Sequence, residues 1–424
     1  MKTKLIVGFC SVLLFLSAPL LPAQKFMPKS IQFKGADGYS DQELLAAAGL
    51  KKGEFLDNDA MNASARQLMD TGLFSSVGFN FDGQNLIFTL APATDLFPFQ
   101  FDNLPLNQDK DTELLVRRAV PLYHGKIPLQ GSISEQVAHA LEAILGGHGI
   151  HSHLVSTTIF DLKTGKPTAL SFSITDIPVV LGAITVQGIE TDSQPTRAAL
   201  YKLSGEAFGN AGSARQIELA LENLWRDQGY LEAEAHATPH FETAESSDKI
   251  RIPFSVSLQR GQQYRVNKII LDASLLTSQA DFDRQSNIHP GDLANAPRIR
   301  ANWEFLARQY HNRGFLKPTI QPVPAFDHDA GTVTYHVSAI PGPVYVMGGL
   351  TIESVPEDIR KAILAAWPMR PGVTFNEGAI RGVFTTHDVN PALERFLATV
   401  NYRYTLQLHD DTGTVDVHLI FSRR

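Results

Sequence analysis

The chain has 424 residues, of which 43% are hydrophobic and 19% are charged. This length is too great for one ordinary domain, and the composition is that of a globular protein, which excludes a disordered or fibrous chain. The 44 acidic residues outnumber the 37 basic ones, which argues against a general nucleic-acid binder, because such a protein needs a basic surface.

The first 23 residues have the pattern of a secretory signal peptide. Lys2 and Lys4 supply the positive start, Leu5 to Phe15 the apolar segment, and Leu21-Pro22-Ala23 a small-residue end. We therefore expect cleavage before Gln24 and a periplasmic mature chain. The alternative is an uncleaved anchor, because the apolar stretch nearly reaches the ~20 residues that a membrane span needs.

The only cysteine, Cys10, lies inside this signal. The mature chain therefore has no disulfide, no thiol nucleophile and no cysteine-based metal site. We expect it to be stabilised by packing alone. Without residues 1–23 the chain keeps 35 basic and 44 acidic residues, a net charge of −9.

The first predicted unit covers residues 28–93. A strand, Ser30 to Lys34, precedes a short helix with Asp41 and Glu43 in its first turn, where negative charge is favourable. A second helix ends at Gly72, and a hairpin follows around Asp82-Gly83, which is a strong turn signal. The predicted order is strand, helix, helix, strand, strand.

The same order recurs four more times along the chain. The glycines that end the second helices are separated by 77, 80 and 85 residues, a longer period than that of short solenoid repeats. Each unit is thus large enough to hold its own small core, and we expect five domains in an elongated string. The four later units are predicted at residues 95–178, 179–261, 262–343 and 344–424.

The fifth unit departs from this pattern in its second helix. The distance from Gly372 to Tyr402 is 30 residues, whereas the matching distance in the fourth unit, from Gly291 to Phe315, is 24. Asn390-Pro391 falls inside the helical pattern. Because proline removes a donor and clashes in a helix interior, we expect a second helix in two pieces.

Five units with this order in a secreted chain resemble POTRA (polypeptide-transport-associated) domains. The features that carry the resemblance are the glycine after the first strand, a glycine in the loop between the helices, the pairs Gly229-Tyr230 and Gly314-Phe315, and the connector Pro341 to Tyr345. The fold class that it implies is α+β, with five tandem β-α-α-β-β domains. Five such domains resemble the periplasmic arm of the Omp85-family outer-membrane assembly factors, without the barrel of that family. A stand-alone arm with a separately encoded barrel and a longer chain are both open.

The resemblance implies a non-enzymatic scaffold for outer-membrane protein assembly or polypeptide transport, with no cofactor. Its implied partners are unfolded outer-membrane proteins or subunits of an assembly machinery. Its implied place is the periplasm, in association with the outer membrane.

A docking strand is expected in the third unit. In the resembling fold the strand after the second helix lies at a sheet edge, where unpaired N–H and C=O groups can pair with an extended peptide. In the fourth unit this strand, Lys317 to Ala325, contains three prolines, which remove donors and protect the edge. The third unit has no proline before Pro239, so its strand is the better candidate. The residues of this candidate are Leu231, Glu232, Ala233, Glu234, Ala235, His236, Ala237 and Thr238.

One grouping of histidines offers an alternative function. His148, His151 and His153 could bind zinc as neutral imidazoles, which would favour an envelope metal-binding protein or enzyme. Their place at a predicted helix end, with no acidic residue between them, favours a solvated helix cap instead. Asp327-His328-Asp329 and His409-Asp410-Asp411 are predicted as hairpin turns, because aspartate suits turn geometry.

Overall fold

The computed structural model describes residues 25–188, 194–243, 245–246, 248–385 and 391–423. The predicted signal peptide lies outside these ranges. The chain forms two compact bodies, and the division between them falls within the third unit. The first body contains the chain up to Ala183 together with Gly205–Ser213 and Pro239–Pro253. The second contains Ile184–Ser204, Ala214–Thr238 and Phe254–Arg424.

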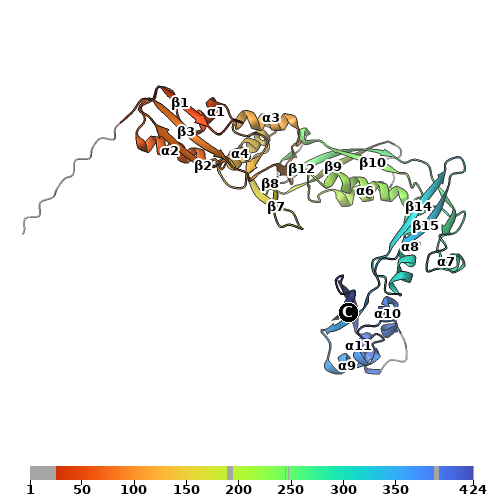
Figure 1. Cartoon of the computed structure of the whole chain (residues 1–424). Helices are drawn as coiled ribbons and strands as arrows, with labels where there is room; N and C mark the ends of the chain where they lie inside the picture. Colours follow the sequence, from red (N-terminus) through yellow and green to blue (C-terminus); the bar gives the residue numbers. More distant parts are fainter. Residues whose placement is uncertain (1–24, 189–193, 244, 247, 386–390, 424) are drawn as a thin grey trace, which may run out of the picture. The chain divides into compact units, whose positions relative to one another are not determined.

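The first unit has a three-stranded sheet with two helices (Figure 1). β1 pairs in parallel with β3, β2 pairs antiparallel with β3, and the order is β1-β3-β2. Asp41 and Glu43 lie in the first turn of α1, as predicted, and Ser40 and Glu43 form a capping box that begins the helix. The elements are β1 (Ser30–Lys34), α1 (Asp41–Ala47), α2 (Asn58–Asp70), β2 (Phe74–Phe81) and β3 (Asn85–Pro92).

The second unit repeats this arrangement with the strand order β5-β8-β7. It adds a separate two-stranded pair, β4 with β6, which has no signal in the sequence because two-residue strands show no alternation. The elements are β4 (Leu96–Phe97), β5 (Phe99–Phe101), α3 (Lys110–Ala119), β6 (Ile127–Pro128), α4 (Ser132–Gly147), β7 (Leu154–Phe160) and β8 (Pro167–Ile174).

The third unit has β12 at the centre of its sheet. β10 pairs with β12 in the order β10-β12-β11, and β9 also pairs with β12. A short 3₁₀ turn, η1 (Phe241–Thr243), follows β10. The other elements are β9 (Val179–Gly188), α5 (Gln194–Leu203), α6 (Ser213–Arg226), β10 (Glu234–Pro239), β11 (Glu245–Ser246) and β12 (Ile250–Gln259).

The fourth and fifth units have the strand orders β13-β15-β14 and β16-β18-β17. The second helix of the fifth unit is in two pieces, as predicted, and Pro391 begins the second piece, where its missing N–H costs nothing. The fourth unit contains β13 (Arg265–Leu271), α7 (Gln279–Gln285), α8 (Ala296–His311), β14 (Thr319–Asp327) and β15 (Thr332–Ile340). The fifth contains β16 (Val346–Glu353), α9 (Glu357–Ala366), α10 (Glu377–Thr385), α11 (Pro391–Leu397), β17 (Val400–His409) and β18 (Thr414–Arg423).

The predicted α+β fold class is confirmed, and so is one feature that matters for binding. In the main sheet of each of the five units, the strand after the second helix lies at an edge. These strands are β2, β7, β10, β14 and β17.

The fourth and fifth units have separate buried cores, one around Phe282 and Leu306 and the other around Phe375 and Leu419. Phe282, Leu306 and Leu419 lie on the inward faces of helices and of a central strand, whereas Phe375 lies in the loop before α10.

Two junctions are built from the same backbone contacts. The N–H of Tyr264 donates to Gly229 O (2.9 Å), and the N–H of Tyr345 donates to Gly314 O (2.8 Å). Both glycines have positive φ, +87° and +86°, which side chains other than glycine rarely adopt. A Cβ on Gly314 would lie 2.9 Å from Tyr345 O. Each of these two glycines thus ends a helix and also contacts the residue with which the next unit begins.

The side chains at these two junctions are matched in position but differ in kind: Glu232 takes the place that Lys317 takes at the other junction. Tyr264 donates to Glu232 and lies 2.7 Å from Nδ1 of His328. Burial, together with the hydrogen bond to Glu232, raises the pKa of Tyr264 to about 12, so the phenol keeps its proton.

At the second of the two junctions, Tyr345 donates to Asp410, which also accepts from Nζ of Lys317 at 2.6 Å. Glu232 and Lys317 each stand three residues after the capping glycine of their unit. His328 and Asp410 each stand directly after the edge strand of the following unit. The hairpin-turn interpretation of both segments holds, and each turn also joins two units.

The junction between the second and third units uses different contacts, all within the first body. The N–H of Asn210 donates to Asp102 O (2.7 Å), and its side-chain Nδ2 donates to Leu104 O (2.8 Å). No atom lies within 4 Å of a Cβ built on Gly149, the glycine that ends α4. This helix end therefore lacks the close contact that Gly229 and Gly314 make.

A half-buried carboxylate makes the contact between α8 and α10 sensitive to acid. Glu377 lies 2.7 Å from Nδ1 of His311 and accepts from the Tyr404 hydroxyl at 2.7 Å. The hydrogen bond from His311 lowers the pKa of Glu377, and burial opposes this effect without cancelling it. Arg381 also faces the carboxylate. A carboxyl with a lowered folded-state pKa stabilises the fold above its unfolded-state pKa, and this contribution is lost as the pH falls through the folded-state value.

We therefore expect the variant Glu377→Gln to be less stable than the wild type by about 1 to 3 kcal/mol at pH 7. The difference should shrink as the pH falls below about 5, because the wild type then loses its charge. Urea denaturation at a series of pH values measures both effects. A difference that is the same at pH 7 and pH 3 would contradict this assignment.

Candidate functional site

The candidate docking strand is shorter than the sequence predicts. β10 begins at Glu234 and ends at Pro239, whereas the prediction began at Leu231. Leu231 and Glu232 lie in a turn, which the N–H of Ala233 closes by donating to Tyr230 O at 3.0 Å. The backbone here must turn from the end of α6 into the sheet, and so it cannot yet be extended.

The structure also shows which backbone donors of β10 face outward. The N–H groups of Ala235 and Ala237 point away from β12 and reach side chains of α6. Because N–H groups alternate in direction along an antiparallel strand, the N–H of His236 points toward the sheet. The sequence could not settle this choice.

Two carboxylates of α6 occupy this edge, and we call Glu218 and Glu222 the carboxylate clamp. Oε1 of Glu218 accepts from the Ala237 N–H at 3.0 Å, and Oε1 of Glu222 accepts from the Ala235 N–H at 3.4 Å. The Glu218 side chain is 13% exposed and that of Glu222 is 5% exposed. The clamp thus covers donors that would otherwise be open at an edge.

Two arginines hold the clamp in place. Nη1 of Arg215 lies 3.2 Å from Glu218 and 3.1 Å from Glu222. Nη1 of Arg226 lies 3.2 Å from Glu222, and its Nη2 donates to Ala233 O at 3.0 Å. Burial raises the pKa of Glu222, but the hydrogen bonds from Arg215 and from the Ala235 N–H outweigh it and lower the pKa overall. The carboxylate is therefore charged at neutral pH.

These four residues were not predicted from the sequence as part of a site. Arg215, Glu218, Glu222 and Arg226 stand three, four and four residues apart, which places them on one face of a helix. That spacing is a readable signal. It indicates a row of helical ion pairs, however, and says nothing about a neighbouring strand.

The edges of the other units are protected in different ways. In the second unit, Glu142 of α4 accepts from the N–H of Leu154, the first residue of β7, at 2.8 Å. In the fourth unit, β14 carries Pro322 and Pro324, which have no N–H to offer. For β2 and β17, the described residues show no side chain bonded to an outward N–H.

The three histidines of the alternative prediction do not all come together: His151 and His153 line one cavity, and His148 is not among its lining residues. His148 is the C-cap of α4, and His148, His151 and His153 are all exposed. His153 lies 3.5 Å from Glu142, which also lies 2.9 Å from His139. Across the described ranges, no group of three or more His, Cys, Asp or Glu residues is placed to hold a metal ion.

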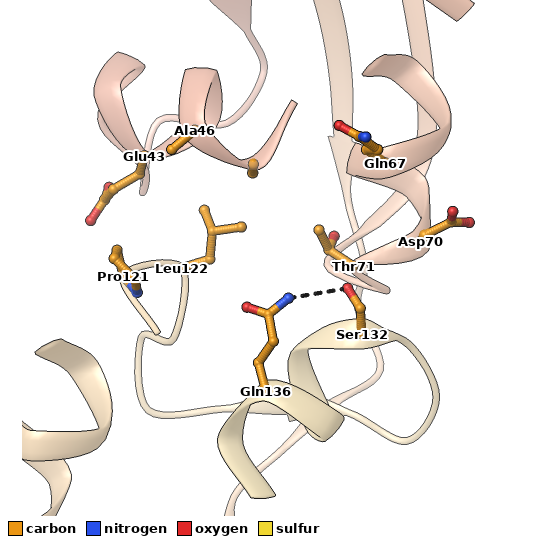
Figure 2. Close-up of a pocket in the computed structure, with 10 residues that line it drawn as sticks. Glu43, Ala46, Gln67, Asp70, Thr71, Pro121, Leu122, Ser132 and Gln136 are labelled. Atoms are coloured by element: carbon orange, nitrogen blue, oxygen red, sulfur yellow. Dashed lines mark hydrogen bonds between the residues drawn. The ribbon is translucent and has the colours of Figure 1, made fainter. Parts of the chain in front are cut away.

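A cavity of about 460 Å³ lies where the first and second units meet (Figure 2). Glu43 and Asp70 bring carboxylates to it, and Leu122 supplies an apolar wall. Its two hydroxyls have ordinary structural partners: Thr71 donates to Leu68 O (2.5 Å), and Ser132 accepts from Gln136 (3.5 Å). Neither hydroxyl lies beside a base that would activate it as a nucleophile. The lining favours a gap between adjoining units over a reaction site.

The geometry described so far defines a class of protein, a chain of β-α-α-β-β units with edge strands and short junctions. The POTRA family model, described as a surface antigen variable number repeat, matches residues 28–92 and 264–339. These segments are the first and fourth units, which share their strand order with the other three. The chain thus contains two segments that match the POTRA model, and as a tandem array of such units it resembles the periplasmic arm of the Omp85 family.

One curated relative is the outer membrane protein assembly factor BamA of Buchnera aphidicola subsp. Acyrthosiphon pisum (strain APS). The two are 19% identical over 340 residues, which cover 77% of this chain and 53% of the relative. The chain thus spans about half the length of the curated relative that it matches.

Solved structures of POTRA segments are also similar to this chain. The POTRA3-5 segment of Haemophilus influenzae BamA is 14% identical, with a TM-score of 0.41, and the match covers 57% of this chain and 95% of that one. The POTRA1-3 segment of Omp85 from Anabaena is 14% identical, with a TM-score of 0.23, and the match covers 59% and 97%. Within the described part of the chain, no helix has the length and apolar character to cross a bilayer.

Proposed function

We propose that this chain is a non-enzymatic periplasmic scaffold for outer-membrane protein assembly. Its partners in this proposal are unfolded outer-membrane proteins or subunits of an assembly machinery, and it acts through five units at residues 28–93, 95–178, 179–261, 262–343 and 344–424. The POTRA match and the similarity to BamA support this role.

The proposed mode of binding is the addition of an extended strand to β10, over residues Glu234 to Thr238. The observation that carries it is the position of β10 at a sheet edge, with the N–H groups of Ala235 and Ala237 directed outward. Such pairing reads the backbone of the partner more than its side chains, and so it suits a protein that handles many β-rich clients.

A pair of proline variants tests this mode. Ala235→Pro removes an outward donor and places a ring at the edge, so we expect it to weaken the binding of an extended peptide while the protein stays folded. His236→Pro removes a donor that faces the sheet, so we expect it to destabilise the third unit by about 1 to 3 kcal/mol. Fluorescence anisotropy of a labelled, unfolded β-barrel peptide and urea denaturation measure the two effects.

The two variants are each other's control, because they differ by one position in the same strand. Loss of peptide binding in Ala235→Pro at unchanged circular dichroism would support strand addition. Equal peptide affinity for the wild type and for folded Ala235→Pro would rule out β10 as the docking strand.

A further inference from the structure

We propose that the carboxylate clamp holds the edge of β10 closed in the free protein, and that a partner strand must displace it to bind. This inference rests on the proposed strand addition and concerns its regulation. Glu218 and Glu222 accept from the same two N–H groups that a partner strand would need, those of Ala237 and Ala235. Each donor has one hydrogen, so the clamp and a paired strand compete for it.

The clamp is organised before any partner arrives. Arg215 bridges both carboxylates, and Arg226 joins Glu222 to the backbone at Ala233. Charge-assisted hydrogen bonds of this kind are stronger than those between neutral groups. The carboxylate oxygens of Glu218 and Glu222 therefore lie at the edge without any rearrangement of α6. They accept the hydrogen bonds that the carbonyl oxygens of a neighbouring strand would otherwise accept.

The carboxylates of the clamp would still have charged partners after a strand displaces them from β10. If Glu218 turns away from Ala237, its carboxylate keeps Arg215, which is 54% exposed and can follow it. Glu222, which is 5% exposed, keeps Arg226 at 3.2 Å when it releases the Ala235 N–H. Opening therefore breaks backbone contacts but leaves each carboxylate beside an arginine. This is what distinguishes a displaceable cover from a permanent cap.

A glutamate that covers the edge strand occurs in some units and not in others. Glu142 and Glu222 each stand seven residues before the capping glycine of their unit, and both accept from an edge strand. The first and fourth units have Ala65 and Ala307 at this position, so they cannot form the contact. Among the four units with a capping glycine, the cover is thus found in the second and third.

The competition sets a requirement on the partner. It must present carbonyl oxygens to Ala235 and Ala237, which are two residues apart, and so it must be extended along this stretch. A partner that binds only through its side chains would leave the clamp in place.

Hydrogen exchange tests the closed edge without any partner. In full-length protein labelled with ¹⁵N-alanine, Glu218→Ala should speed the amide exchange of Ala237 on the order of tenfold. Glu234→Ala is the matched control, because it removes one exposed negative charge from β10 itself and touches neither donor; it should leave that rate unchanged. Equal Ala237 rates in the wild type and in Glu218→Ala would overturn the clamp.

Peptide binding then tests the competition. The probe is a soluble peptide of alternating threonine and valine with lysine at both ends, and the same peptide with a central proline is its control. We expect Glu218→Ala to bind the probe on the order of tenfold more tightly than the wild type. Equal affinity would overturn the competition. Absence of binding to both proteins would overturn strand addition itself, and the exchange result would still decide whether the edge is closed.

Discussion

Replacing Phe375 by alanine is expected to lower the stability of the fifth unit by about 3 to 5 kcal/mol, the usual cost of deleting a buried aromatic ring. Phe375 is fully buried in the core that contains Ile380 and Leu419, and the core of the fourth unit is a separate cluster. Differential scanning calorimetry should therefore show one transition moving to lower temperature while the others stay in place.

Val373→Ala is the matched control for this experiment. Val373 lies two residues away and is 51% exposed, so its truncation should cost less than about 0.5 kcal/mol. A single transition that moves as a whole in Phe375→Ala would show that the units unfold together, and would contradict separate cores.

The second large effect is expected at Gly314, where an alanine should lower the stability by about 2 to 4 kcal/mol. The φ of +86° is unfavourable for a side chain. The new Cβ would also lie 2.8 Å from Thr374 Cγ2 and 2.9 Å from Tyr345 O. The backbone oxygen cannot move without breaking the start of the next unit. Urea denaturation followed by tryptophan fluorescence measures the loss.

Gly291→Ala separates the two causes. Gly291 has a similar φ of +91°, but no atom lies within 4 Å of its would-be Cβ. This variant should therefore lose only the stability that the unfavourable φ costs a side chain, roughly 1 to 2 kcal/mol. Equal losses in both variants would show that the contact between the fourth and fifth units contributes nothing.

Much of the fold could be predicted from the sequence because local signals set it. The capping box at Ser40 and Glu43 positions α1, and Pro391 divides the last helix of the chain. The recurring order of elements indicates the edge position of β10 through the POTRA resemblance. Each of these features depends on residues that are close together in the sequence.

The rest depends on contacts between distant segments, which no local pattern encodes. The strand boundary at Glu234 is set by the turn at Tyr230 to Ala233, where the sequence alone shows only an unbroken apolar-polar stretch. The clamp needs α6 beside β10, so Glu218 and Glu222 look like ordinary surface glutamates in the sequence. The roles of Tyr264 and Tyr345 likewise depend on partners 32 and 65 residues away.

The partners at the two tyrosine junctions differ, so each unit is matched to its natural neighbour. Glu232 meets His328, and Lys317 meets Asp410. If the fourth unit were removed, Glu232 would face Asp410, and two carboxylates would repel each other. If the fourth unit were duplicated, Lys317 would face His328 and lose its acidic partner. A shuffled array would thus lose the matched partners at its tyrosine junctions.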